Sequence, residues 1–215
     1  MRSSAAAQRL VVGISGASGV IYGVRLLEVA RDLGLETHLV ISKAAELTLG
    51  YETDWKPDQV RALAHTAYAA QDVGAAIASG SFKTIGMIVA PCSIRTMSEL
   101  ATGVTTSLLT RAGDVMLKER RPLILMIRET PLHLGHLRTM TALSEMGAII
   151  APPMPALYAN PKTVEELIDQ SVGRVFDLLG LDAAPTRRWG EDLTQGRRRP
   201  QAGPGKSTSP KTPKR

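Results

Sequence analysis

The chain of 215 residues contains one cysteine, Cys92, few aromatic residues and no long apolar run. A single cysteine excludes an internal disulfide framework and fits a reducing compartment, so we expect a cytoplasmic protein. An aromatic content of 4% argues against a platform that stacks single-stranded nucleic acid. No stretch reaches the roughly 18 uninterrupted apolar residues of a membrane-spanning helix, and residues 1–9 are too weakly apolar for a secretory signal. We therefore expect neither a membrane nor a specific nucleic acid as partner.

The net charge of +6 is concentrated at the C-terminal end of the chain. Residues 196–215 carry seven basic and no acidic side chains, which leaves 19 basic and 20 acidic side chains in residues 1–195. This end is also rich in proline and glycine, so residues 192–215 are predicted to be a disordered basic tail. Both a solvated extension and an arm for nucleic acid or membranes remain open for it. With residues 1–8 as a short extension, residues 9–191 form one predicted domain.

Strand and helix patterns alternate through this domain. Short apolar runs predict strands at residues 10–14, 36–41, 85–90, 123–127 and 148–151. Helical patterns lie at residues 20–33, 43–49, 57–70, 131–146 and 163–179, and another leads from a loop at 91–96 through residue 118. This alternation predicts an α/β protein with a doubly wound parallel sheet.

The motif GISGASG at residues 13–19 joins the first predicted strand to the first predicted helix. Small residues at such a junction leave backbone N–H groups unpaired at the positive end of a helix, where an anion, most often a phosphate, is favoured. The spacing differs from the dinucleotide fingerprint, because Ser15 stands where that motif has its second glycine. A bound phosphate ester and a tight structural turn are both compatible with this loop.

The residues that follow the other strands extend the pattern. Ser42 and Lys43 follow the second strand, residues 91–96 follow the central strand, and Arg128 and Glu129 follow the fourth. Ligands of open parallel sheets bind outside the carboxyl ends of the strands. One edge of the sheet therefore gathers hydroxyl groups, backbone loops and two arginines, a set that favours a phosphorylated ligand.

Five segments together resemble the UbiX family of flavin prenyltransferases, formerly described as aromatic-acid decarboxylases. They are GISGASG (13–19), PCSIRT (91–96), LTRAGDVMLKERRP (109–122), RETPLHLGHLR (128–138) and MGAIIAPPMPALY (146–158). The resemblance implies a flavodoxin-like three-layer α/β/α fold and a homododecamer with flavin sites at subunit interfaces. It also implies that reduced FMN is alkylated at N5 and C6 by dimethylallyl phosphate, giving prenylated FMN for a UbiD-type decarboxylase.

The resemblance assigns roles to residues by their position in these motifs. The implied FMN contacts are Gly16, Ala17, Ser18, Ser42, Ser93, Ile94, Arg95, Thr96 and Arg128. The implied dimethylallyl-phosphate contacts are Lys118, Arg128, Glu129, Tyr158 and Arg174, and the implied catalytic residues are Ser18, Glu52, Lys118 and Glu129. Glu129 would protonate the departing phosphate, and Ser18 and Glu52 would form a proton relay. With three cationic side chains around the phosphate, no metal ion is expected.

Several of these residues have a simpler interpretation when the resemblance is set aside. Lys118 would then be a solvated helix end, since basic residues favour the C-terminal end of the helix dipole. Arg174 would be a surface residue of the last helix, Glu52 a helix-terminal carboxylate and Tyr158 a packing residue.

Two other features point away from metal or thiol chemistry. His133 and His136 are three residues apart on one predicted helix, but with no cysteine nearby and Glu129 as the available carboxylate we expect no zinc site. Cys92 is expected to be a buried or loop thiol rather than a nucleophile.

The sequence departs from the family pattern in two places. Residues 105–107 (Thr-Thr-Ser) stand where an Asp-Asn or Asp-Gly pattern is expected before the Leu-Leu-Thr-Arg run at 108–111. Gly113 replaces an expected alanine, at a cost of roughly 1 kcal/mol within a helix. The missing aspartate affects none of the assigned catalytic positions.

Two rival functions were compared with prenyl transfer. An FMN-dependent decarboxylase of the cysteine-decarboxylase group relies on a histidine just after the first loop and on an Asn-Met motif, and the sequence has neither between Val20 and Arg31 or around Pro91. A non-catalytic flavin-binding carrier would explain the small-residue loops but not a second cationic phosphate site. The choice between dimethylallyl monophosphate and pyrophosphate, and the identity of the partner decarboxylase, are left open by the sequence.

Overall fold

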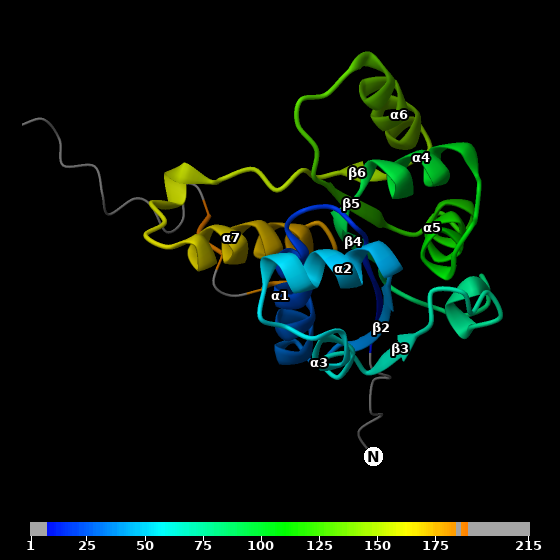
Figure 1. The fold of residues 1–215 in the computed structure, drawn as a ribbon, viewed down its shortest axis with the longest axis horizontal. Helices are drawn as coiled ribbons and strands as arrows, with labels where there is room; N and C mark the ends of the chain where they lie inside the picture. Colours follow the sequence, from blue (N-terminus) through cyan, green and yellow to red (C-terminus); the bar gives the residue numbers. More distant parts are fainter. Residues whose placement is uncertain (1–7, 184–185, 189–215) are drawn as a thin grey trace, which may run out of the picture.

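Six parallel strands form one sheet in the computed structural model, which describes residues 8–183 and 186–188 (Figure 1). The strands are β1 (Arg9–Ile14), β2 (Glu36–Ile41), β3 (Thr66–Tyr68), β4 (Gly86–Cys92), β5 (Leu123–Ile127) and β6 (Ile149–Ile150). The helices are α1 (Val20–Asp32), α2 (Lys43–Glu52), α3 (Pro57–Arg61), α4 (Ile94–Thr102), α5 (Leu108–Lys118), α6 (Leu134–Glu145) and α7 (Val164–Asp177). Two short 3₁₀ turns, η1 (Ala76–Ala78) and η2 (Leu157–Ala159), complete the set.

The order of the strands is β3-β2-β1-β4-β5-β6. The chain builds the sheet outward from β1 to β3, returns to place β4 beside β1, and then builds outward to β6. The direction of winding therefore reverses between β1 and β4. In open α/β sheets such a reversal opens a crevice at the carboxyl ends of the two strands, where ligands bind.

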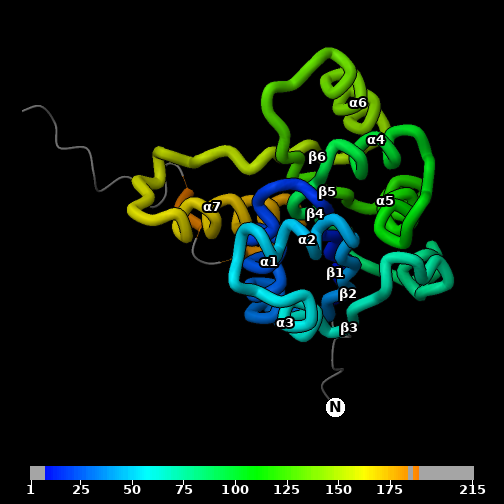
Figure 2. Tube along the Cα trace, viewed as in Figure 1, coloured from blue at the N-terminus to red at the C-terminus, as the bar shows by residue number. Residues whose placement is uncertain are grey.

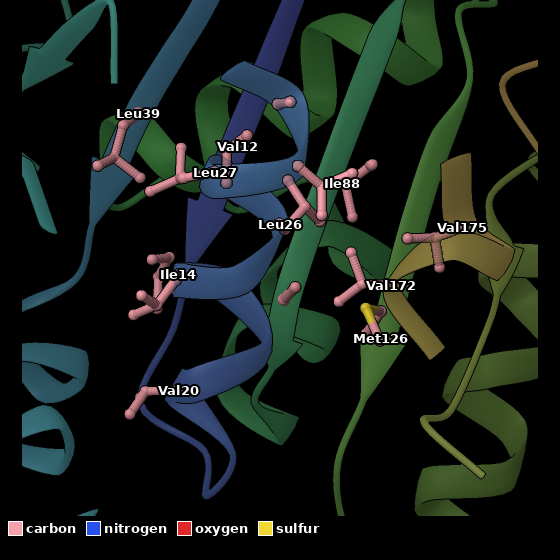
Figure 3. Close-up of a cluster of buried hydrophobic side chains, with 14 of the residues drawn as sticks. Val12, Ile14, Val20, Leu26, Leu27, Leu39, Ile88, Met126, Val172 and Val175 are labelled. Atoms are coloured by element: carbon pink, nitrogen blue, oxygen red, sulfur yellow. The ribbon is translucent and has the colours of Figure 1, made fainter. Parts of the chain in front are cut away.

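Helices cover both faces of the sheet, so the central strands are buried on both sides. Leu10, Val12 and Ile14 of β1 belong to a hydrophobic cluster with α1 and α7, and Figure 3 shows part of it. Val11, between them on the strand, belongs to a second cluster with α4 and α5. Burial on alternate faces explains why β1, β4 and β5 are continuous apolar runs. The predicted three-layer, doubly wound fold is confirmed.

Helix α6 stands apart from this packing. It buries one residue, Leu143, and Figure 2 shows it on one side of the body, beside α4. Leu134 and Leu137 on the same helix are 60% and 47% exposed. A helix with exposed leucines and little buried surface is typical of a contact face in an assembly.

Most predicted elements are confirmed, but the helix predicted at residues 57–70 is wrong. Only Pro57–Arg61 is helical, and Thr66–Tyr68 form strand β3, which pairs with residues 38–40 of β2. The free edge of β2 offers backbone partners to this segment, and threonine and tyrosine favour strands. Tertiary pairing therefore outweighed the local helical pattern.

Several other boundaries also differ from the predictions, and three of these differences have a local structural reason. Strand β4 continues through Pro91 to Cys92, because the strand ladder shifts register between Val89 and Cys92 and a residue without N–H is tolerated at such an irregularity. The pattern leading to residue 118 is two helices, separated where Gly103 (φ 70°) ends α4. Helix α6 begins at Leu134 rather than at residue 131, since the His133 side chain caps it.

Two predictions lie partly or wholly outside the described residues. These are the disordered tail at residues 192–215 and, apart from Gln8, the extension at residues 1–8. Among the helices of the described chain, none combines the length and apolar character needed to cross a bilayer.

Candidate active site

A cavity of about 630 Å³ lies at the carboxyl edge of the sheet, at the crevice between β1 and β4. Its size is within the range of about 300–1,000 Å³ that is usual for small-ligand sites. All nine residues predicted to contact FMN line it. They are Gly16, Ala17, Ser18, Ser42, Ser93, Ile94, Arg95, Thr96 and Arg128. Four segments that are far apart in the sequence thus meet at one ligand-sized space.

Three helix N-termini open onto this cavity, those of α2, α4 and α5. Each begins with a serine, whose hydroxyl accepts a hydrogen bond from the backbone N–H three residues later: Ser42 from Ala45, Ser93 from Thr96 and Ser107 from Thr110. The remaining N–H groups of each first turn have no carbonyl partner within the helix. Three positive helix ends around one space favour an anionic ligand.

The side chain of Ser15 locks two of these loops together. Its hydroxyl donates to the backbone oxygen of Pro91 (2.8 Å) and accepts from the backbone N–H of Ser93 (2.7 Å), and Ser15 is 1% exposed. A glycine at this position would lack both bonds. Ser15 therefore sets the distance between the loop after β1 and the loop after β4.

An internal carboxylate occupies the N-terminus of α1, where the sequence favoured a bound phosphate. Glu52, at the end of α2, accepts hydrogen bonds from the backbone N–H groups of Gly19 (2.7 Å) and Val20 (3.2 Å). The anion predicted at this helix end is therefore part of the chain. The first loop contributes to the cavity through Gly16, Ala17 and Ser18 instead.

A second, smaller cavity of about 200 Å³ lies beside α7. Tyr158 and Arg174, both assigned to dimethylallyl phosphate, line it together with Met126, Gln170 and Ser171. Its other wall is the extended segment at residues 151–156. Arg174 is exposed and forms an ion pair with Asp177 (3.4 Å), and the Tyr158 hydroxyl accepts a hydrogen bond from the Gln170 amide (3.4 Å).

The two cavities lie on either side of the end of β5. Met126 lines the smaller cavity, whereas Arg128, two residues later, lines the larger one. Tyr22 of α1 is near both. Burial raises the pKa of its phenol, while the charge of Arg128 and a hydrogen bond with Ser171 act in the opposite direction. The sequence analysis missed Tyr22, which follows the GISGASG loop by three residues.

The structure brings Glu129 to the larger cavity but does not bring Lys118 there. Glu129 is exposed on the cavity rim and accepts a hydrogen bond from the Thr130 N–H (2.9 Å). Lys118 is the last residue of α5 and pairs with Glu119 (2.5 Å). The C-terminal end of α5 lies away from the cavity onto which its N-terminus opens, so within one subunit Lys118 lines neither cavity.

His133 lies at a helix N-terminus and Cys92 lies in the hydrophobic core. The His133 ring accepts hydrogen bonds from the backbone of Gly135 (3.0 Å) and His136 (3.4 Å), so it acts as a helix cap. Within residues 8–183 and 186–188, no three histidine, cysteine, aspartate or glutamate residues are grouped closely enough to hold a metal ion. Cys92 is fully buried, as predicted, and burial raises the pKa of its thiol.

Several lining residues of the larger cavity were missed by sequence reasoning. Those at the α5 end of the cavity are Glu99, Thr106, Ser107, Leu109 and Thr110, with Ala70, whose backbone oxygen accepts a hydrogen bond from the Leu108 N–H, and Gln71 beside them. Ala44, in the first turn of α2, was also missed. The Ser-x-x-Thr pattern at 107–110 was a detectable helix-start signal. Ala70 and Gln71 could not be found, because their segment was predicted to be helical.

Comparisons with known proteins agree with this geometry. A family model described as Flavoprotein matches residues 2–176. The chain is 58% identical to the flavin prenyltransferase UbiX of Escherichia coli (strain K12) over 171 residues, which are 79% of this chain and 90% of that protein.

Two solved structures are similar to the whole described domain. One is AnUbiX in complex with FMN and dimethylallyl pyrophosphate, with a TM-score of 0.84, 49% identity, and coverage of 85% of this chain and 97% of that chain. The other is a dodecameric FMN-dependent UbiX-like decarboxylase from Escherichia coli O157:H7, with a TM-score of 0.83, 46% identity, and coverage of 85% and 99%.

Proposed function

The chain belongs to the UbiX family of flavin prenyltransferases, and we propose that its larger cavity binds reduced FMN and its smaller cavity the dimethylallyl donor. In the overall reaction the carbon–oxygen bond of the donor breaks and its C=C bond is consumed, while bonds form from two donor carbons to N5 and C6 of the flavin. N5 and C6 each lose the proton that the new bond replaces, and a former alkene carbon of the donor takes up one proton. Phosphate and prenylated FMN are the products.

One observation carries the assignment of the flavin site. The nine residues expected to contact FMN come from four segments of the chain, and all of them line one space. The chemistry of this space fits the flavin. Three helix N-termini and the Arg95 and Arg128 side chains suit its phosphate, and serine and threonine hydroxyls suit its ribityl chain.

The smaller cavity fits a donor with an apolar tail and a phosphate head. Met126, Val175 and Leu178 supply apolar surface, and Arg174 supplies a cation. AnUbiX was solved with dimethylallyl pyrophosphate. For the present chain we propose the monophosphate, since no acidic cluster for a magnesium-bound pyrophosphate was found in the sequence.

Three sets of residues would carry the proton and charge transfers. Glu129 would donate a proton to the departing phosphate, and Arg128 and Arg174 would stabilise its negative charge without a metal ion. Ser18, which lines the flavin cavity, and Glu52, which binds the N–H of the adjacent Gly19, would relay a proton from the flavin.

Lys118 would reach a donor only in the site of a neighbouring subunit. We propose a homododecamer, as in the Escherichia coli O157:H7 structure, in which the exposed end of α5 meets the site of another copy. The exposed apolar side chains Met154 (74%) and Leu157 (74%), next to the smaller cavity, would lie in this interface. A UbiD-type decarboxylase in the cytoplasm would receive the product.

The direct test is to incubate the protein with reduced FMN and dimethylallyl monophosphate and to determine the mass of the flavin product by mass spectrometry. A flavin heavier by one dimethylallyl group supports the proposal. Unchanged FMN that stays bound would indicate a carrier instead. Decarboxylation of a peptidyl cysteine without any prenylated flavin would indicate the cysteine-decarboxylase alternative.

A further inference from the structure

Glu99 is an acidic residue inside the larger cavity to which the proposed function assigns no role. It lies on α4, one turn after Arg95, and its side chain is 14% exposed. A carboxylate at this place needs an explanation, because the same cavity is built to hold a phosphate. Two negative charges in one cavity repel each other unless cations and hydrogen-bond donors stand between them.

Both oxygens of Glu99 are held by defined partners. One accepts a hydrogen bond from the Arg95 side chain (Nε, 2.8 Å), and the other accepts one from the Thr106 hydroxyl (2.7 Å). Burial would raise the pKa of Glu99, but the hydrogen bonds from Arg95 and Thr106 outweigh burial and lower it. Glu99 is therefore a charged and compensated carboxylate at neutral pH.

The bond to Glu99 uses one side of the Arg95 guanidinium and leaves the other available. Arg95 is 80% exposed and lines the cavity. Its two terminal nitrogens have no hydrogen-bond partner within the described part of the chain. A guanidinium that is anchored through Nε can still donate from both terminal nitrogens to a phosphate, and anchoring reduces the entropy lost on binding.

The second contact of Glu99 reaches the loop that precedes α5. Thr106 belongs to residues 105–107, the segment in which the family resemblance leads us to expect an aspartate. In this chain the loop supplies the Thr106 hydroxyl instead, and the carboxylate that it binds is that of Glu99 on α4. One carboxylate thus links Arg95, in the first turn of α4, to the loop that leads into α5.

We propose that Glu99 is a positioning residue for the flavin phosphate. It holds Arg95 at the cavity wall and, through its bond to Thr106, supplies to the segment at 105–107 the carboxylate that the family pattern places within that segment. This inference rests on the proposed function insofar as FMN is the ligand. It adds a residue that acts through Arg95 and does not itself touch the flavin.

The test compares the affinities of the full-length protein for FMN and for riboflavin, which lacks the phosphate, by quenching of flavin fluorescence. Glu99→Ala should weaken FMN binding about tenfold and change riboflavin binding less than about twofold. Arg95→Ala should do the same, and the double variant should bind FMN no more weakly than Arg95→Ala alone, because the two residues act as one unit. Glu28→Ala, which removes a helix carboxylate paired with Arg25 outside both cavities, is the matched control and should leave both affinities unchanged.

A second experiment moves the carboxylate from position 99 to position 106, and so tests whether Glu99 takes the place of the expected aspartate. Thr106→Asp alone brings a second carboxylate against Glu99 and should weaken FMN binding. In the Glu99→Ala background the same substitution should restore FMN affinity to within about threefold of the unmodified protein. The melting temperature of each variant identifies any that fail to fold. Restored FMN binding in the variant that combines Glu99→Ala with Thr106→Asp would itself show that the cavity is folded.

The inference is overturned if Glu99→Ala leaves FMN affinity intact, if riboflavin affinity falls equally, or if moving the carboxylate restores nothing. These failures differ from those of the proposed function. If the flavin site were wrong, the unmodified protein would bind neither flavin, and if only prenyl transfer were wrong, the unmodified protein would bind FMN without prenylating it.

Discussion

The two cavities of this protein are built in different ways. The larger cavity is bounded by the ends of parallel strands and by three helix N-termini, so backbone groups supply much of its binding surface. The smaller cavity lies between α7 and an extended segment, and its polar groups belong to a few side chains such as Tyr158 and Arg174. We infer that the flavin is held by prebuilt architecture and the donor by individual side chains.

The largest expected effect is at Glu129, on the rim of the larger cavity. Glu129→Gln keeps the shape of the side chain but removes its acidic proton. FMN should still bind, while prenyl transfer in a single-turnover assay should slow about 100-fold or more. Transfer at the unmodified rate would show that the departing phosphate takes its proton from another group.

Arg174→Ala should distinguish the function of the smaller cavity from that of the larger one. It removes the cation of the smaller cavity and should raise the KM for dimethylallyl phosphate about 30-fold, with FMN affinity unchanged. Arg31→Ala, on the last turn of α1 and outside both cavities, is the matched control. An equal loss of FMN affinity in Arg174→Ala would mean that the two cavities bind as one site.

Ser15→Ala tests the prebuilt character of the larger cavity. The substitution leaves the half-buried Ser93 N–H without its acceptor and should destabilise the fold by about 1–3 kcal/mol. Because the two loops lose both side-chain bonds and keep only the backbone bond from the Ser15 N–H to the Pro91 oxygen, FMN affinity should fall about fivefold. Urea unfolding and flavin titration measure the two effects. Unchanged values for both would show that the loops are held by other contacts.

The smallest expected effect is that of a chelator. Arg128 and Arg174, with Lys118 from a neighbouring subunit, are proposed to stabilise the phosphate, so EDTA should leave the rate of prenyl transfer unchanged. If EDTA abolished prenyl transfer and magnesium restored it, the prediction would be contradicted. A metal ion, rather than the cationic side chains, would then stabilise the phosphate.

Much of the larger cavity was predictable from the sequence. Strands β2 and β5 begin and end at the predicted residues, and Ser42 caps α2 as expected. Parallel strands bring their carboxyl ends to one edge, so the residues after each strand could be grouped before the structure was known. The nine flavin contacts were implied by motifs of the family, and the fold brings them together.

The smaller cavity and the internal contacts of the larger one were less predictable. No local pattern indicates that Glu52 reaches Gly19 across 33 residues, or that the segment at 66–68 joins β2 as a strand. The Glu99 carboxylate looked like one more charge on a helix, because its partner Thr106 lies beyond the end of that helix.

The sequence by itself determined the class of the fold, the edge at which ligands bind and the family. These depend on hydrophobic periodicity, helix-start residues and contiguous motifs, which are properties of neighbouring residues. Only the tertiary structure decided that Glu52 fills the first helix N-terminus, that Arg128 and Arg174 line separate cavities, and that Glu99 bridges two helices. Each of these depends on the distance in space between groups that are far apart in the sequence, and the assembly of the sheet fixes that distance.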